Sequence, residues 1–281
     1  MSNDEINIDS LKQENTYLHK QLENLNEKLR ESDAFKSHFL SNITNEIINP
    51  FTSILGISKS ISRLDAEKIG QIHSMANLIY NEAFDLDFQL QNIFAAAKIE
   101  SGEINLELSS IQPNEDVMAI IEEIRFKAEK KSQYIEFKCE DNIPHNFVTD
   151  ADKFQIVIKN LLLNAVIFGD EKSKISIRME YTDTSLIMEV NNSGNIIKNE
   201  DLKGIFNRFT KLDKTINSIN QGHGLGLSVS KAYLDLLEGS IDVESNEDMG
   251  NTFKIKLPQT ENDPDSLIRE DDLFIDDSEI F

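Results

Sequence analysis

The N-terminal third of the chain carries apolar residues at helical spacing. Leucines recur at alternating steps of four and three among Glu, Lys and Gln, which is typical of a coiled-coil seam. Asn15 occupies a seam position, where a buried amide pairs with its counterpart and favours a parallel two-stranded dimer. We therefore predict a homodimer through this seam, which consists of Leu11, Leu18, Leu22, Leu25 and Leu29.

Two helices are predicted after the seam. The same register continues through Phe39 to Ile43, and apolar spacing resumes over 47–55, where Pro50 is expected to kink the helix. A second apolar stripe covers 72–97, and Ser101-Gly102 is expected to end that helix. Two such helices from each of two chains make a four-helix bundle.

The pattern then alternates between strand and helix periods, which predicts an α+β multidomain fold. An α/β sandwich should follow the bundle. Its strands are expected at 104–108, 134–137, 174–181, 185–190, 240–243 and 252–257, and its helices at 117–128, 152–168 and 227–238.

Four segments are predicted from these changes of pattern. They are a coiled coil over 1–32, a helical-hairpin dimerisation domain over 33–103, an α/β sandwich over 104–258 and a flexible acidic tail over 259–281. Small apolar clusters in the tail fit either a segment that folds on a partner or a solubilising tail. They comprise Leu267, Ile268, Leu273, Phe274 and Ile275.

Charge and composition exclude some classes of binding partner. A net charge of −22 repels nucleic acid and anionic lipid, so neither is expected as a partner. No apolar run approaches the roughly 18 residues that span a bilayer, so we expect no membrane insertion and a cytoplasmic location. A single cysteine, Cys139, excludes an internal disulfide.

Four short motifs stand in a fixed order. The run from Phe39 to Gly56 reads FLSNITNEIINPFTSILG, and Asn160 begins NLLLNA. The segment FNRF includes Arg208, and Gly222 begins GHGLGL. These runs resemble the histidine, asparagine, phenylalanine and second glycine motifs of bacterial sensor histidine kinases.

The resemblance implies a dimerisation and phosphotransfer domain followed by an ATPase domain of the Hsp90-like type. It also implies ATP and Mg²⁺ as cofactors, and the receiver domain of a response regulator as partner. At the position where the family carries its phosphorylated histidine, this chain has Asn45. An amide nitrogen is not a nucleophile because its lone pair is delocalised into the carbonyl, so autophosphorylation is predicted to be absent.

Glu46 and Asn49 lie at i and i+3 and share one helix face. This spacing resembles the phosphatase signature of the same family, in which the second residue orients a water against the phosphoaspartate of a regulator. That reaction needs a positioned water and a metal from the regulator, but no histidine. The alternative is that both residues are merely exposed helix positions.

Two asparagines, Asn160 and Asn164, lie four apart on one predicted helix and offer side-chain oxygens to Mg²⁺ if nucleotide binds. Glycine backbones at 222, 224 and 226 approach phosphates at a helix start. The resemblance adds Arg208 and a first glycine motif, Asn192-Ser-Gly194-Asn-Ile196. The full set of predicted nucleotide-binding residues is Asn160, Asn164, Asn192, Gly194, Arg208, Gly222, Gly224 and Gly226.

Nucleotide binding is predicted to be weakened. Asn192 stands where the family has an adenine-binding aspartate, and Ile196 replaces the second glycine of that motif. Ile167 replaces a lysine that commonly follows the asparagine motif. The adenine end of the site is therefore expected to be altered more than the phosphate end.

Three functions are consistent with the sequence. The first is a degenerate histidine kinase that docks a response regulator and removes its phosphate or sequesters it. The second is a non-enzymatic scaffold or dimer partner of an active histidine kinase. The third is an active kinase with an unusual acceptor such as His38, which lies one heptad before Asn45 and about 10 Å from it along the helix.

Overall fold

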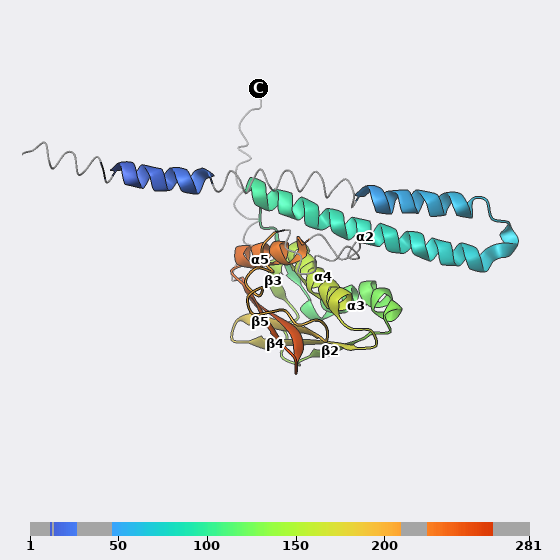
Figure 1. Cartoon of the computed structure of the whole chain (residues 1–281). Coiled ribbons are helices and arrows are strands. Elements are labelled where there is room, and N and C mark those ends of the chain that lie inside the picture. Colours follow the sequence, from blue (N-terminus) through green and yellow to red (C-terminus); the bar gives the residue numbers. More distant parts are fainter. Residues whose placement is uncertain (1–11, 13, 27–46, 209–223, 261–281) are drawn as a thin grey trace, which may run out of the picture. The chain divides into compact units, whose positions relative to one another are not determined.

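The computed structural model describes residues 12, 14–26, 47–208 and 224–260 (Figure 1). The chain divides into two compact units, Met1–Gln89 and Leu90–Phe281. The boundary lies within one long helix, α2 (Ile69–Ser101), so the last three turns of α2 belong to the second unit. Among the described residues, no helix is long and apolar enough to span a membrane.

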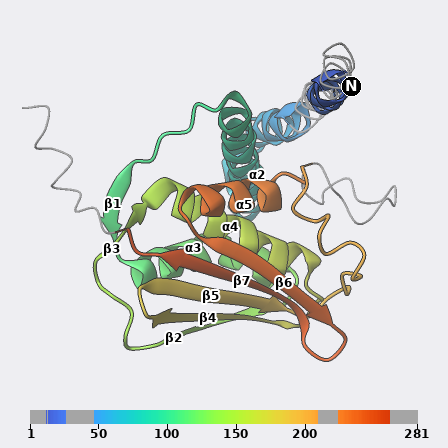
Figure 2. The same cartoon turned by 90° about the vertical axis from the view of Figure 1, so that its left-hand side faces the viewer.

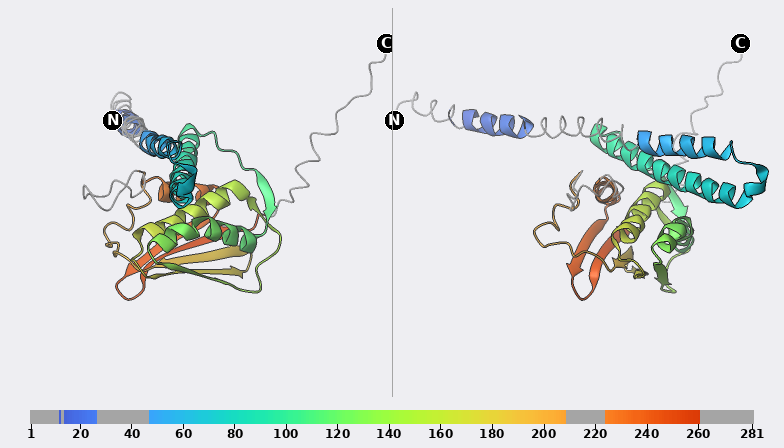
Figure 3. Two further views of the ribbon diagram at one scale, coloured as in Figure 1. Left: turned by 90° about the vertical axis from the view of Figure 1, so that its right-hand side faces the viewer. Right: turned by 45° about the vertical axis from the view of Figure 1, so that its right-hand side comes forward.

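Helices make up most of the described part of the first unit. One covers 14–26 and another 47–61, and the short η1 (Ala66–Lys68) precedes α2. Figures 1 and 3 show helix 47–61 running back along the first half of α2, as a helical hairpin requires. The predicted seam residues Leu11, Leu29, Phe39 and Ile43 lie outside the described residues, whereas Leu18, Leu22 and Leu25 are exposed.

Helix α2 ends where the sequence predicts. Gly102 follows it with φ of +71°, a left-handed conformation that a Cβ would strain, and the N–H of Glu103 donates to the carbonyl of Lys98 at 3.1 Å. The strand predicted over 104–108 is wrong in its extent. The first strand, β1, is Leu108–Ile111, because its antiparallel partner β3 (Phe147–Asp150) pairs only from Leu108 onward.

A five-stranded sheet forms the base of the second unit (Figure 2). Its first pair is parallel and the other three pairs are antiparallel. The strands lie in the order β2 (Tyr134–Cys139), β4 (Lys174–Thr182), β5 (Ser185–Asn192), β7 (Gly250–Pro258) and β6 (Ser240–Asn246).

Three helices cover one face of this sheet: α3 (Pro113–Lys130), α4 (Ala151–Phe168) and α5 (Gly226–Leu236) (Figure 2). Helix α4 lies between the other two and is the most apolar, with nine buried residues. Sheet and helices together confirm the predicted α+β sandwich. The period of two along β5 buries Leu186, Met188 and Val190, and it places Asn192 on the same helix-covered face.

Both ends of α4 are capped by side chains. Asp150, which is 1% exposed, accepts from the backbone N–H of Lys153 at 3.1 Å and from that of Glu107 at 2.9 Å. At the other end, Lys131 Nζ donates to the carbonyls of Val166, Ile167 and Gly169 at 2.7–3.0 Å. A cation at a helix C-terminus is favourable, although burial lowers the pKa of Lys131 and offsets part of this gain.

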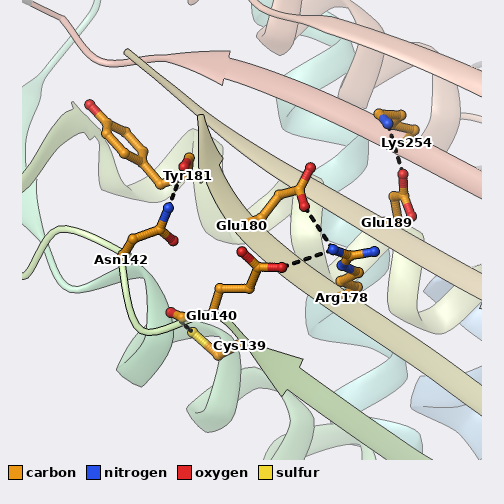
Figure 4. Close-up of polar contacts among 8 residues, drawn as sticks. All are labelled: Cys139, Glu140, Asn142, Arg178, Glu180, Tyr181, Glu189 and Lys254. Atoms are coloured by element: carbon orange, nitrogen blue, oxygen red, sulfur yellow. Dashed lines mark hydrogen bonds and ion pairs between the residues drawn. The ribbon is translucent and has the colours of Figure 1, made fainter. Parts of the chain in front are cut away.

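The opposite face of the sheet is polar (Figure 4). Arg178 on β4 pairs with Glu140 and Glu180, and Lys254 on β7 pairs with Glu189 on β5. Burial raises the pKa of the neighbouring Cys139 thiol, and the carboxylates of Asp141 and Glu140 raise it further.

Replacing Lys131 by methionine tests the C-terminal cap of α4. The variant keeps the apolar stem but leaves three carbonyls without their charged donor, so it should lose about 1–3 kcal/mol of unfolding free energy. Urea denaturation of Lys131→Met and of the exposed control Lys203→Met measures this. Equal midpoints for both variants would contradict the assignment.

Candidate nucleotide site

Helix α4 supplies the first two predicted site residues. Asn160 is 3% exposed, whereas Asn164, one turn later, is partly exposed. Because the two residues are four apart on α4, they share one face of the helix, but only Asn164 has substantial access to solvent. Their neutral amide oxygens are ligands that Mg²⁺ accepts together with phosphate oxygens.

Gly226 brings the second glycine motif against Asn160. It is the first residue of α5, and a Cβ added there would lie 2.6 Å from Asn160 Oδ1. A Cβ at this position would therefore have to displace the buried Asn160 carboxamide. Gly224 has φ of +69°, which also favours glycine, and Gly222 lies outside the described residues.

The first glycine motif meets the C-terminal end of α4. Asn192 is the last residue of β5 and is 2% exposed. Gly194 forms an isolated bridge with Gly169, and a Cβ on Gly194 would lie 2.2 Å from the carbonyl oxygen of Phe168. The structure thus brings the asparagine motif and both glycine motifs together along one helix.

Asn251 and Ser245 hold the loop after Gly194, a role that the sequence did not predict. Asn251 Nδ2 donates to the carbonyl of Asn195 at 3.1 Å, and Ser245 Oγ donates to Asn251 Oδ1 at 2.6 Å. The N–H of Ile197 donates to Ser245 Oγ at 2.8 Å. These contacts fix the backbone around Ile196 against the β6–β7 hairpin.

Two further contacts come from α2. Asn160 Nδ2 donates to Asn92 Oδ1 at 2.9 Å, and the Arg208 guanidinium pairs with the Glu100 carboxylate. One local signal marks Asn92 in the sequence, which is its place as a polar residue at the start of an apolar helical stretch. Arg208 therefore contacts an acidic side chain of the protein itself, in addition to being a predicted nucleotide-binding residue.

The residues of the histidine motif are only partly described. Asn49 is exposed on helix 47–61, while Asn45, Glu46 and His38 lie outside the described residues. Phe209 and the tail clusters predicted over 267–275 also lie outside them. The geometry of the Glu46–Asn49 pair therefore stays a prediction.

Electrostatics tie α5 to the start of α4. Lys153 pairs with Asp150, and its Nζ lies 5.7 Å from the centre of the Tyr233 ring on α5. Burial raises the pKa of Tyr233, so its hydroxyl stays neutral at physiological pH. The contact fixes the helix whose N-terminus begins at Gly226.

The arrangement fits a magnesium nucleotide. Described residues contain no group of three His, Cys, Asp or Glu side chains that could hold a metal alone. A metal here would instead need amide oxygens, such as those of Asn160 and Asn164, together with phosphate oxygens. The positive end of the α5 dipole at Gly226 favours an anion beside them.

Comparisons with known proteins identify the type of domain that contains these residues. Residues 149–261 match the model of the histidine kinase-, DNA gyrase B- and HSP90-like ATPase family. The heme sensor protein HssS of Staphylococcus aureus (strain Newman) is 26% identical over 234 residues, which are 83% of this chain and 49% of HssS. Sensor histidine kinase TmoS of Ectopseudomonas mendocina is 27% identical over 241 residues, 85% of this chain and 24% of TmoS.

Two solved structures share the fold over most of the chain's length. Histidine kinase ThkA in complex with response regulator TrrA is 26% identical, with a TM-score of 0.52, and the match covers 84% of this chain and 64% of that one. Full-length ShkA with AMPPNP shares the fold, with 19% identity, a TM-score of 0.57 and coverage of 83% and 47%.

The chain spans about half the length of HssS and a quarter of TmoS. Its ATPase domain is of a type that implies ATP binding, typically with Mg²⁺. The sandwich and the matched relatives lead to one conclusion: residues 149–261 belong to an ATPase domain of the histidine kinase-, DNA gyrase B- and HSP90-like family, and over four-fifths of its length the chain is similar to bacterial sensor histidine kinases.

Proposed function

We propose that this protein is a degenerate histidine kinase that docks a response regulator on its helical hairpin and removes its phosphate or sequesters it. Asn45 at the acceptor position is the observation that carries the proposal. Accepting a phosphoryl group from ATP needs a nucleophilic nitrogen, and the amide of Asn45 has none. Functions that need no acceptor remain available to the chain.

Dephosphorylation is one such function. Its chemistry needs a water placed in line with the phosphorus of the regulator's phosphoaspartate, and the regulator itself supplies the metal. Exposure of Asn49 on helix 47–61 leaves its amide free to orient this water. Glu46, one turn earlier, completes the proposed pair.

The hairpin also offers a surface for docking. Ile48, Phe51 and Leu55 are 53–56% exposed and lie at i, i+3 and i+7 on helix 47–61, beside Asn49. An exposed apolar stripe of this kind is typical of a protein interface. ThkA, which is similar to this chain, forms a complex with the response regulator TrrA. A receiver domain is therefore our proposed partner.

A homodimer would complete the proposed architecture. Leu18, Leu22 and Leu25 are 51–70% exposed on helix 14–26, as seam residues are without a second chain. We propose a coiled coil over 1–32 and a hairpin domain over 33–103, which pairs with its copy in a four-helix bundle. The ATPase domain over 104–258 and the acidic tail over 259–281 would follow.

ATP with Mg²⁺ is the proposed cofactor, bound more weakly than in active kinases. Asn192 offers an amide oxygen where the family has a carboxylate, and hydrogen bonds to charged groups contribute more than those to neutral ones. Asn192 Nδ2 also donates to the carbonyl of Ser193 at 3.2 Å. Ile196, held by the β6–β7 hairpin, adds a branched side chain at this end of the site.

Asn49→Ala tests the phosphatase activity. The natural chain should speed phosphate loss from a phosphorylated regulator, and the variant should lose roughly tenfold or more of this acceleration because the water is no longer oriented. The exposed Asn77→Ala on α2 serves as control. If neither the natural chain nor Asn49→Ala changes the rate of phosphate loss, dephosphorylation is ruled out. Regulator binding, measured in parallel, would then distinguish a protein that sequesters the regulator from a scaffold that binds another kinase.

Gly226→Ala tests the nucleotide site. The new Cβ would meet Asn160 Oδ1 at 2.6 Å, and the buried amide can move only by giving up its hydrogen bond to Asn92. Affinity for Mg-ATP should fall by about tenfold in calorimetric titration, as expected for a displaced ligand. Gly204→Ala, where the nearest atom would be 3.4 Å away, should bind like the natural chain. Unchanged binding by Gly226→Ala would contradict the site.

A further inference from the structure

Asn92 and Asn160 form a buried amide pair between α2 and α4. Each side chain is 3% exposed, and the donor–acceptor distance is 2.9 Å. Because a buried amide left without a partner is costly, this pairing strongly restricts how the Asn160 carboxamide can rotate.

The direction of the hydrogen bond decides where Asn160 points its oxygen. Asn92 receives the Nδ2 donor, so the Asn160 NH₂ group faces α2. Its Oδ1 lies instead beside Gly226, at the first turn of α5. This is the end of α5 where its dipole favours the phosphates and metal of a bound nucleotide.

We propose that Asn92 is a positioning residue that holds the Asn160 carboxamide with its oxygen toward the magnesium ion and phosphates of a nucleotide. The proposal rests on the proposed nucleotide binding and adds a residue outside the ATPase motifs to it. Reversing the amide would present NH₂ to a cation, which repels it. Partners that orient a metal ligand commonly affect metal affinity by 10–100-fold.

The hydrogen bond also links the nucleotide site to α2. A movement of α2 away from α4 would break this hydrogen bond and release the Asn160 amide. Because coupling between two sites is reciprocal, bound Mg-nucleotide in turn stabilises the hydrogen bond between Asn92 and Asn160. The second contact with α2 is the ion pair between Glu100 and Arg208, whose side chains are 32% and 37% exposed. Exposed ion pairs contribute little, so we assign the coupling to Asn92.

Titration of the full chain with ADP, once with Mg²⁺ and once with EDTA, tests the role of Asn92. Asn92→Leu removes the acceptor but keeps four side-chain heavy atoms with the same branching, and it should weaken Mg-ADP binding by about tenfold or more while changing metal-free ADP binding less than twofold. Asn92→Asp keeps an acceptor oxygen and should retain the ratio of the two affinities. Asn77→Leu makes the same change at an exposed position of α2, and this variant should bind Mg-ADP and metal-free ADP as tightly as the natural chain does.

Three outcomes would overturn the proposal. Equal losses with Mg²⁺ and with EDTA would assign Asn92 a purely structural role, and unchanged Mg-ADP binding by Asn92→Leu would remove the role altogether. Absence of ADP binding by the natural chain would overturn the proposed nucleotide site, and this role with it.

A nucleotide-free measurement separates the hydrogen bond from the function built on it. A double-mutant cycle of Asn92→Leu and Asn160→Leu, followed by urea denaturation, should show clear coupling between the two positions. Strictly additive effects would show that the amide pair does not form in solution, and would overturn the proposal even if nucleotide binds. The cycle also covers the case in which Asn92→Leu alone is too unstable to titrate.

Discussion

Helix α4 depends on groups outside itself to satisfy both of its ends, and the candidate site depends on α4. Asp150 caps its first turn and Lys131 contacts three carbonyls of its last. Between these caps the helix presents Asn160 to Gly226, and its end meets Gly194. Because all three motifs use the same rigid element, their relative positions follow from one helix packed on a sheet.

Periodicity predicted most of this fold, since α4 and strands β4 and β5 carry strong apolar patterns bounded by turn residues. The short strand β3 was not predicted, and β1 was placed too early. Each is only four residues long, and each exists because it pairs with the other over Leu108–Ile111 and Phe147–Asp150. A contact between segments so far apart in sequence leaves no local pattern in either one.

Motif resemblance predicted the candidate site residues, and the structure brings Asn160, Gly194 and Gly226 to one helix. Asn92 and Asn251 were not predicted, because each acts through a contact with a distant segment rather than through a motif. A buried asparagine beside apolar residues is the one local sign of such a role, since an amide is buried only where a partner satisfies it. The hydrogen bond between Asn92 and Asn160 links the candidate nucleotide site to α2.

We propose that the ATPase domain and the hairpin are retained parts of a signalling protein whose acceptor chemistry has been lost at a single position, Asn45. Incubation with labelled ATP and Mg²⁺, followed by acid and alkali treatment, tests this directly when the natural chain is compared with Asn45→His. We expect no acid-labile phosphate on the natural chain. On Asn45→His we expect acid-labile phosphate at ATP concentrations that saturate its nucleotide site. Acid-labile phosphate on the natural chain would contradict the account.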